Sequence, residues 1–224
     1  MHLKVITPPL YPVVSLAEVY EHLRWDTETE TTPGVGSPPG PDTETIVYPL
    51  EAMITRNIAT ATQQVEATTR RSLCQRELML CASTFSEFDG AQHSIELPMP
   101  PVFGIVSVEY YDSTNTLVAV DVADYFITDS VVPRLGFVTG FSVPTTYARD
   151  DAVQVTYLAG YEPEYTGSPL TTNQALYAAN VPERLKDAVL LTLQLFVDRF
   201  DPVERTAMLR ARDWLLADFI IYSV

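Results

Sequence analysis

The sequence has few of the residues that most binding and catalytic functions require, and its shortage of positive charge is the most informative. Of 224 residues, 14 are lysine or arginine and 29 are aspartate or glutamate, which gives a formal net charge of −15. Proteins that hold nucleic acid neutralise its phosphates with cationic side chains. The balance therefore argues against a protein that grips DNA or RNA. It favours solubility without attraction to passing polyanions.

Long apolar runs are also missing. A bilayer-spanning helix needs about 20 consecutive apolar residues, and the longest candidate, residues 188–197, is about half that length. The N-terminal MHLKVITPPLYP has no apolar run followed by a small-residue cleavage site, so we predict no signal peptide. We expect no membrane partner.

Cysteine and histidine are scarce and poorly spaced for chemistry. Cys74 and Cys81 form no CxxC motif, and on one strand they would point to opposite faces, which disfavours a disulfide. We predict reduced thiols. His2, His22 and His93 lack the spacing of metal ligands. We expect no metal site and no cofactor.

No arrangement of residues predicts catalysis. The chain has no GxSxG nucleophile turn and no calcium-loop pattern. Asp150 and Asp151 are the strongest acidic pair, and a metal-dependent nuclease is the enzyme that they would serve; adjacent carboxylates in a turn are more often only solvated. We therefore name no catalytic residue and predict that the protein is not an enzyme.

Four segments have the signature of helices. In residues 14–24, Ser15 and Glu18 can form a capping box, with Val14 and Val19 as a hydrophobic staple. Residues 48–71 carry apolar side chains at steps of three and four, which predicts one buried stripe. Its members are Leu50, Met53, Ile54, Ile58, Ala61 and Val65. The third helix spans residues 182–199, and the last runs from about Val203 to the end of the chain.

Two other segments differ from this pattern. Residues 26–46 combine proline, glycine and acidic residues with no apolar period, which predicts a flexible loop. Between residues 77 and 161, short β-branched and aromatic runs alternate with turn formers, which predicts about six antiparallel strands. These runs are ELMLCAS, SIELP, IVSVEYYD, TLVAVDV, DYFITD and AVQVTYLAGY.

The predicted fold class is α+β: a four-helix core with an antiparallel β domain inserted between the second and third helices. Residues 1–75 form the N-terminal half of the helical core and include the loop 26–46. Residues 76–161 form the inserted β domain, and residues 162–224 form the C-terminal half of the helical core.

Two apolar helices raise the question of what covers them. Residues 188–197 have only two polar side chains, Thr192 and Gln194, and the favoured interpretation is a core helix of the chain itself. The C-terminal WLLADFIIYSV is less easily buried, because chain ends are usually frayed and polar unless something holds them. A partner protein or another copy of the chain is the predicted cover.

Six segments, in order over most of residues 3–200, resemble the head–tail connector, or adaptor, proteins of long-tailed bacteriophages and related gene transfer agents. The most specific pieces are the opening PVVSLAEVYEHLRWD, the IELPMPP run, and AGY followed by VPERLKDA. The full set is ITPPLYPVVSLAEVYEHLRWD, QQVEATTRRSLCQRELML, SIELPMPPVFGIVSVEYYD, DYFITD, VQVTYLAGY and VPERLKDAVLLTLQLFVDRF.

The resemblance implies a helical core with an inserted β domain, assembled as a dodecameric ring under the portal in the neck of a virion made in bacterial cytoplasm. The ring would join the portal protein to a stopper, head-closure or tail protein, and double-stranded DNA would pass through its channel without sequence-specific binding. The alternative is a capsid or tail accessory module away from the portal vertex. No catalytic residue is implied.

The sequence departs from the connector pattern in four places. The segments 26–45 and 162–180 are longer, FSVP at 141–144 stands where Trp-Pro is common, and FVDRF replaces the usual aromatic-Asn-Arg-Glu ending. Residues 201–224 match least. Two residue sets follow as hypotheses. Ring and core packing is assigned to Leu185, Val189, Leu193 and Phe196, and portal docking is assigned to Trp214, Leu215, Phe219, Ile220 and Tyr222.

Overall fold

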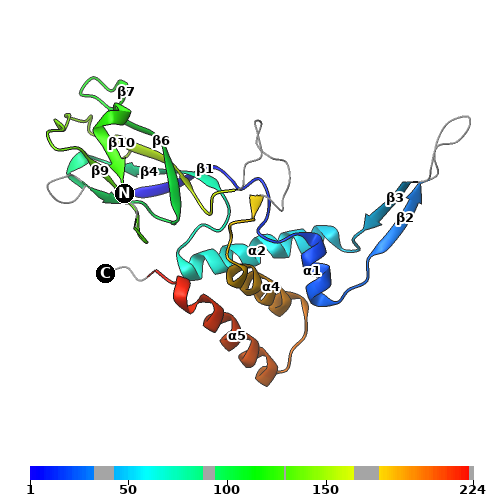
Figure 1. Ribbon diagram of the computed structural model, residues 1–224. Helices are drawn as coiled ribbons and strands as arrows, with labels where there is room; N and C mark the ends of the chain where they lie inside the picture. Colours follow the sequence, from blue (N-terminus) through cyan, green and yellow to red (C-terminus); the bar gives the residue numbers. More distant parts are fainter. Residues whose placement is uncertain (33–42, 88–93, 129, 164–176, 222–224) are drawn as a thin grey trace, which may run out of the picture. The chain divides into compact units, whose positions relative to one another are not determined.

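The computed structural model describes residues 1–32, 43–87, 94–128, 130–163 and 177–221 (Figure 1). The chain divides into two compact units. The sheet unit comprises Met1–Tyr11, Glu66–Pro182 and the chain from Asp218, and the helical unit comprises Pro12–Val65 and Glu183–Ala217. Helices and antiparallel sheets are both present, as the sequence predicts. The division into domains at residues 76 and 161 stays a prediction; in this grouping residues 1–11, 66–75, 162–182 and the chain from 218 go with the strands.

A five-stranded antiparallel sheet organises the sheet unit, in the order β1-β4-β10-β6-β7. The predicted strands are present, but β1 comes from the N-terminal segment, for which no strand was predicted. β1 pairs with β4, setting Leu3 opposite Leu80 and Val5 opposite Leu78 (Figure 1). The strands are β1 (His2–Thr7), β4 (Arg76–Ala82), β6 (Val102–Tyr111), β7 (Leu117–Ala119) and β10 (Val153–Ala159).

A second sheet, in the order β5-β9-β8, covers the core with the first. It is built from β5 (Ile95–Glu96), β8 (Tyr125–Ile127) and β9 (Arg134–Phe137), of which β9 was not predicted. Alternate residues of β4 and β10 bury their side chains beneath it, as period-two strands require. The Phe85 ring lies edge-on to Phe137, which in turn stacks on Phe141 with ring centres 4.3 Å apart. Phe141 belongs to the FSVP segment, which differs from the connector pattern, and its ring packs against the core.

Helices α1 (Leu16–Leu23) and α2 (Glu51–Thr69) form as their end signals and stripes predict. The Ser15 hydroxyl accepts from the Glu18 amide at 3.2 Å, and the Glu18 carboxylate accepts from the Ser15 amide at 2.6 Å. The predicted capping box is therefore confirmed. Of the predicted stripe on α2, Ile54, Ile58, Ala61 and Val65 are buried. Leu50 is exposed, because it precedes the helix with a left-handed φ of 65°.

Helices α4 (Glu183–Val197) and α5 (Pro202–Leu216) pack against each other, and α4 also packs against α1. Burial of α4 is extensive, since six of its side chains are inaccessible: Leu185, Ala188, Val189, Thr192, Leu193 and Leu195. The Thr192 hydroxyl donates to the Ala188 carbonyl at 2.7 Å, so its polar group needs no partner outside the helix. The chain's own residues therefore cover most of this apolar helix.

The prediction of a flexible loop over residues 26–46 is wrong for much of that segment. β2 (Glu28–Thr32) pairs antiparallel with β3 (Thr43–Val47), setting Glu28 opposite Val47 and Thr29 opposite Ile46. Threonine alternates with acids in the sequence here, and the described side chains of Glu28, Thr29, Thr45 and Ile46 are exposed. We call this pair the β2–β3 ribbon. Residues 33–42 lie outside the described part of the chain.

The last helix does not continue to the end of the chain. α5 ends at Leu216, and a single 3-10 turn follows over Ala217–Phe219. The Arg71 guanidinium donates to the Phe219 carbonyl at 2.8 Å, and the Ile221 amide donates to the Thr69 carbonyl at 3.2 Å. These bonds hold the segment 218–221 against the end of α2 in the sheet unit. The backbone after α5 therefore does not continue the helical hydrogen-bond pattern.

No helix in the described ranges combines the length and the hydropathy that crossing a bilayer requires. Cys74 lies just before β4 and Cys81 lies within it, and both side chains are buried.

Candidate functional site

Of the acidic pair at residues 150–151, Asp151 has a structural role in the fold. The Arg149 guanidinium donates to both carboxylate oxygens of Asp151, at 2.6 and 2.9 Å, and lies 3.7 Å from the centre of the Tyr111 ring. These hydrogen bonds lower the pKa of the Asp151 carboxyl. The arrangement fixes the turn before β10. Among the residues that the structure describes, no three His, Cys, Asp or Glu side chains gather as metal ligands.

The histidines occupy unrelated surroundings. The Nε2 atom of His22 lies 3.2 Å from the Gln194 amide oxygen and so joins α1 to α4. His2 lies on the exposed strand β1, and His93 lies outside the described residues.

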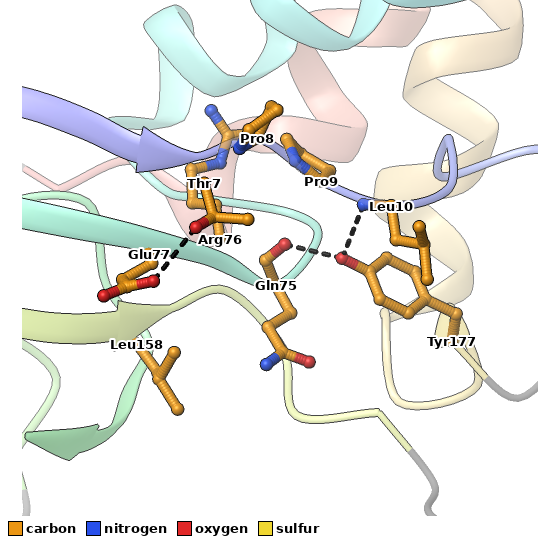
Figure 2. A pocket seen from close by; sticks show the side chains of 9 residues that line it. All are labelled: Thr7, Pro8, Pro9, Leu10, Gln75, Arg76, Glu77, Leu158 and Tyr177. Carbon is orange, nitrogen blue, oxygen red and sulfur yellow. Dashed lines mark hydrogen bonds between the residues drawn. The ribbon is translucent and has the colours of Figure 1, made fainter. Parts of the chain in front are cut away.

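The sheet unit contains an open, mainly apolar pocket of about 460 Å³ at the end of β1 (Figure 2). The Tyr177 hydroxyl lies at its wall, donates to the Gln75 carbonyl at 2.6 Å and accepts from the Leu10 amide at 3.1 Å. The Thr7 hydroxyl donates to the Glu77 carboxylate at 3.0 Å. The lining residues are Thr7, Pro8, Pro9, Leu10, Gln75, Arg76, Glu77, Leu158 and Tyr177.

These hydrogen bonds give the pocket wall a structural role. They tie the chain after β1 to the segment that leads into β4, so polar groups at the wall are already used inside the fold. An active site instead directs polar groups at a substrate. No signal in the polar segment 162–180 marked Tyr177 for this role.

A buried ion pair lies next to the pocket. Arg76 donates to the Glu66 carboxylate at 2.5 Å, and the same oxygen accepts from the Leu73 amide at 2.9 Å. The two side chains are 14% and 5% exposed. Burial raises the pKa of the Glu66 carboxyl, and the Arg76 charge and the Leu73 hydrogen bond oppose this effect without cancelling it. The pair fixes the connection between α2 and β4.

The predicted docking residues have different accessibilities. Trp214 is 71% exposed, with the Arg184 guanidinium 5.3 Å from its ring centre and donating to its carbonyl at 3.1 Å. Leu215, Phe219 and Ile220 are half-buried. Tyr222 lies outside the described residues. Trp214 is therefore the docking candidate that presents the most surface.

The segment 218–221 depends on Arg71, whose role the sequence did not reveal. Arg70 and Arg71 follow α2, where a cation favourably meets the negative end of the helix dipole. Arg70 has a left-handed φ of 57°, and Arg71 reaches the Phe219 carbonyl instead. A pair 148 residues apart leaves no periodic trace in the sequence.

The four residues assigned to ring and core packing also differ in burial. Leu185, Val189 and Leu193 are fully buried within the chain, and Phe196 is 44% exposed at the end of α4. The first three therefore belong to the core of the helical unit, and Phe196 is the member available to another molecule.

Comparison with known proteins gives one kind of match. No protein-family model and no curated protein matches the chain. Solved structures do match over 100% of this chain and 97% of the chain compared. They are the neck of an empty gene transfer agent particle computed with C6 symmetry (TM-score 0.68, 18% identity), the virion of a native gene transfer agent particle (0.67, 19%), and the neck of a native particle computed with C12 symmetry (0.64, 18%).

These matches span all of the chain and not one of its units alone. They agree with the resemblance to head–tail connectors that the sequence motifs carry. The chain therefore has the fold of a chain found in the neck of gene transfer agent particles.

Proposed function

We propose that the protein is a structural subunit of a ring in the neck of a phage-like particle, where it joins the portal to a stopper or tail protein. The observation that carries this proposal is the full-length match to chains of gene transfer agent necks. Fold alone does not fix function. Here the ordered connector motifs of the sequence point the same way, and the described residues present no competing catalytic arrangement.

The ring is proposed to contain twelve copies. The matched necks were computed with C6 and with C12 symmetry, and a closed ring needs one surface of the subunit to fit a different surface of its neighbour. The net charge of −15 suits a channel that lets DNA slide, because acidic walls repel phosphates and do not hold them.

Within this role, Trp214 is the proposed anchor on the portal. An exposed aromatic side chain beside an arginine is typical of interface hot spots. Leu215, Phe219, Ile220 and Tyr222 stay in the proposal as the further docking residues assigned from the sequence. Truncating the chain after Asp213 would be a poor test, since it would also remove Leu216, which is fully buried.

A point substitution tests the anchor more cleanly. Trp214→Ser removes the exposed ring, and Val203→Ser changes another exposed apolar residue on the same helix. Both variants should keep the melting temperature of the parent. Trp214→Ser should lower co-sedimentation with portal on the order of tenfold or more, as loss of a hot spot does, and Val203→Ser should leave it unchanged. Equal binding by all three proteins would refute the anchor.

Electron microscopy tests the function itself. The purified chain mixed with portal should give rings stacked on the portal. A chain that decorates capsid or tail and leaves the portal bare would support the accessory-module alternative and contradict the connector role.

A further inference from the structure

The outer edge of β1 is an open strand edge with apolar side chains. β1 is the first strand of its sheet, so among the described residues only β4 pairs with it. All six of its residues are exposed. Leu3 and Val5 lie opposite Leu80 and Leu78 and so share a face with the buried core, yet they are 39% and 56% exposed. The apolar face of the sheet thus extends onto the edge strand β1, where its side chains are exposed to solvent.

Proteins usually prevent an open strand edge from pairing with other strands, and here Lys4 serves that purpose. A lysine on an edge strand prevents pairing with a like strand, since two copies would bring equal charges together. The chain has only two lysines, Lys4 and Lys186, and His2 lies on the same strand. This edge therefore rejects another β1 and favours a strand that carries acids.

The β2–β3 ribbon lacks a further strand and carries the acidic residues that would complement Lys4. It is a two-stranded sheet with no third strand among the described residues, and an isolated pair of strands is at best marginally stable in water. Its described side chains include exposed Glu28 and Ile46, the latter 58% exposed. Asp26, two residues before Glu28, is also exposed. The ribbon thus has open edges, an acidic base and an uncovered apolar residue.

We propose that β1 of one copy adds to the β2–β3 ribbon of a second copy of this chain, which forms a continuous intermolecular sheet. Backbone hydrogen bonds along the strand would supply affinity, as in other strand additions. Lys4 facing Glu28, and Leu3 or Val5 beside Ile46, would set the choice of partner. This inference rests on the proposed ring function and identifies the surface between its subunits.

The geometry of the contact also favours a ring. β1 and the ribbon are different parts of the chain, so each copy would use one surface toward one neighbour and the other surface toward the next. Such a head-to-tail contact generates a ring when the rotation closes, whereas a self-complementary contact stops at two copies.

Thiol cross-linking tests the pairing. The variants Leu3→Cys/Thr29→Cys and Lys4→Cys/Thr45→Cys place thiols on matching faces of β1 and of either strand of the ribbon. The natural thiols Cys74 and Cys81 are buried and give little background. Treated with a short bismaleimide, at least one double variant should give a ladder of products above the dimer. Each single-cysteine variant should stay monomeric in a denaturing gel.

Charge reversal provides a second, independent measurement. Lys4→Glu should weaken self-association in sedimentation velocity on the order of tenfold, and adding Glu28→Lys should restore it. Lys4→Arg is the matched control and should associate like the parent. Because Lys4 is exposed, none of these variants should change the melting temperature.

Three results would overturn the inference. They are rings in micrographs with no ladder beyond the dimer, a chain that stays monomeric at every concentration, and Lys4→Glu with unchanged association. The proposed function would survive the first and third results, and also the second if rings still form on the portal. It fails if the chain never decorates the portal.

Discussion

Replacing Arg76 with methionine should destabilise the sheet unit strongly, because it leaves a carboxylate buried without its cation. The Glu66 side chain is 5% exposed, and its oxygen already accepts from the Leu73 amide. Removing one partner of a buried ion pair costs about 3–5 kcal/mol. We expect a loss of that size in the free energy of unfolding at neutral pH, measured by urea denaturation followed by circular dichroism.

An exposed ion pair in the same unit is the matched control. Arg134 lies 3.0 Å from the Glu96 carboxylate, and the two side chains are 32% and 61% exposed. Water screens such a pair, so its contribution is about 0–1 kcal/mol. Arg134→Met loses this pair, worth about 1 kcal/mol or less, together with hydrogen bonds to the Ser94 hydroxyl and carbonyl at 3.2 and 3.4 Å, and it should still cost less than Arg76→Met.

The pH dependence follows from the raised pKa of the Glu66 carboxyl. A carboxyl whose pKa is higher in the folded state binds its proton more readily there, so its contribution is complete below the unfolded pKa and is lost as pH rises through the folded one. Arg76 lowers this pKa, so Arg76→Met should raise it further. The variant should thus lose less stability at about pH 5 than at about pH 8.

Neutralising the acid should rescue the variant. Glu66→Gln/Arg76→Met keeps an oxygen that can accept from the Leu73 amide and removes the buried charge. It should recover most of the lost stability and show no difference between the two pH values. An Arg76→Met variant as mild as Arg134→Met, or one that is worse in acid, would refute the reasoning.

Four further substitutions probe two glycines, one shared hydrogen bond and one helix cap. Gly160→Ala should cost several kcal/mol in urea denaturation, because φ is +108° and an added Cβ would lie 2.3 Å from the Cys74 carbonyl oxygen, whereas Gly140→Ala, at φ +93° with open space, should cost only about 1–2 kcal/mol. Equal losses would contradict the steric explanation. Tyr177→Phe leaves the Leu10 amide and Gln75 carbonyl without their shared partner and should lower the free energy of unfolding by about 1–3 kcal/mol; no change would mean that water replaces the hydroxyl. Asp201→Ala removes the capping box of α5 and should cost about 1 kcal/mol, seen as reduced helicity on heating.

The helices and strands that bury one face could be predicted from the sequence, whereas the strands with little buried surface were missed. The stripe on α2 and the capping box at Ser15 carry their own periodicity and end signals. The strands from β4 to β10 show the alternation of a half-buried sheet, apart from the short β9. β1 has only the short alternation Leu3-Lys4-Val5 and the ribbon has few apolar residues, so neither gave a pattern long enough to predict a strand.

The candidate site could be predicted only in part, for a related reason. Trp214 was identified because an apolar residue near a chain end has no obvious cover, and the structure leaves it exposed. The partners of Phe219 and Ile221 were not foreseen, because a side chain reaching a carbonyl 148 residues away depends on tertiary structure. The same holds for Tyr177, which lies in a segment with no periodic pattern.

The question of what covers the apolar helix at residues 182–199 has a physical answer, and that answer leaves the assembly surface to other elements. The chain itself buries Leu185, Val189 and Leu193, so that helix does not need a neighbour for its burial. Several apolar groups that do lack a cover lie on thin elements, at Leu3 and Val5 of β1 and at Ile46 of the ribbon. Thin elements bury little area within one chain, and they gain most when a second chain supplies the missing layer. A ring built through them would therefore be stabilised at the edges of its subunits, and its assembly would respond to changes in β1 that leave the fold of the monomer intact.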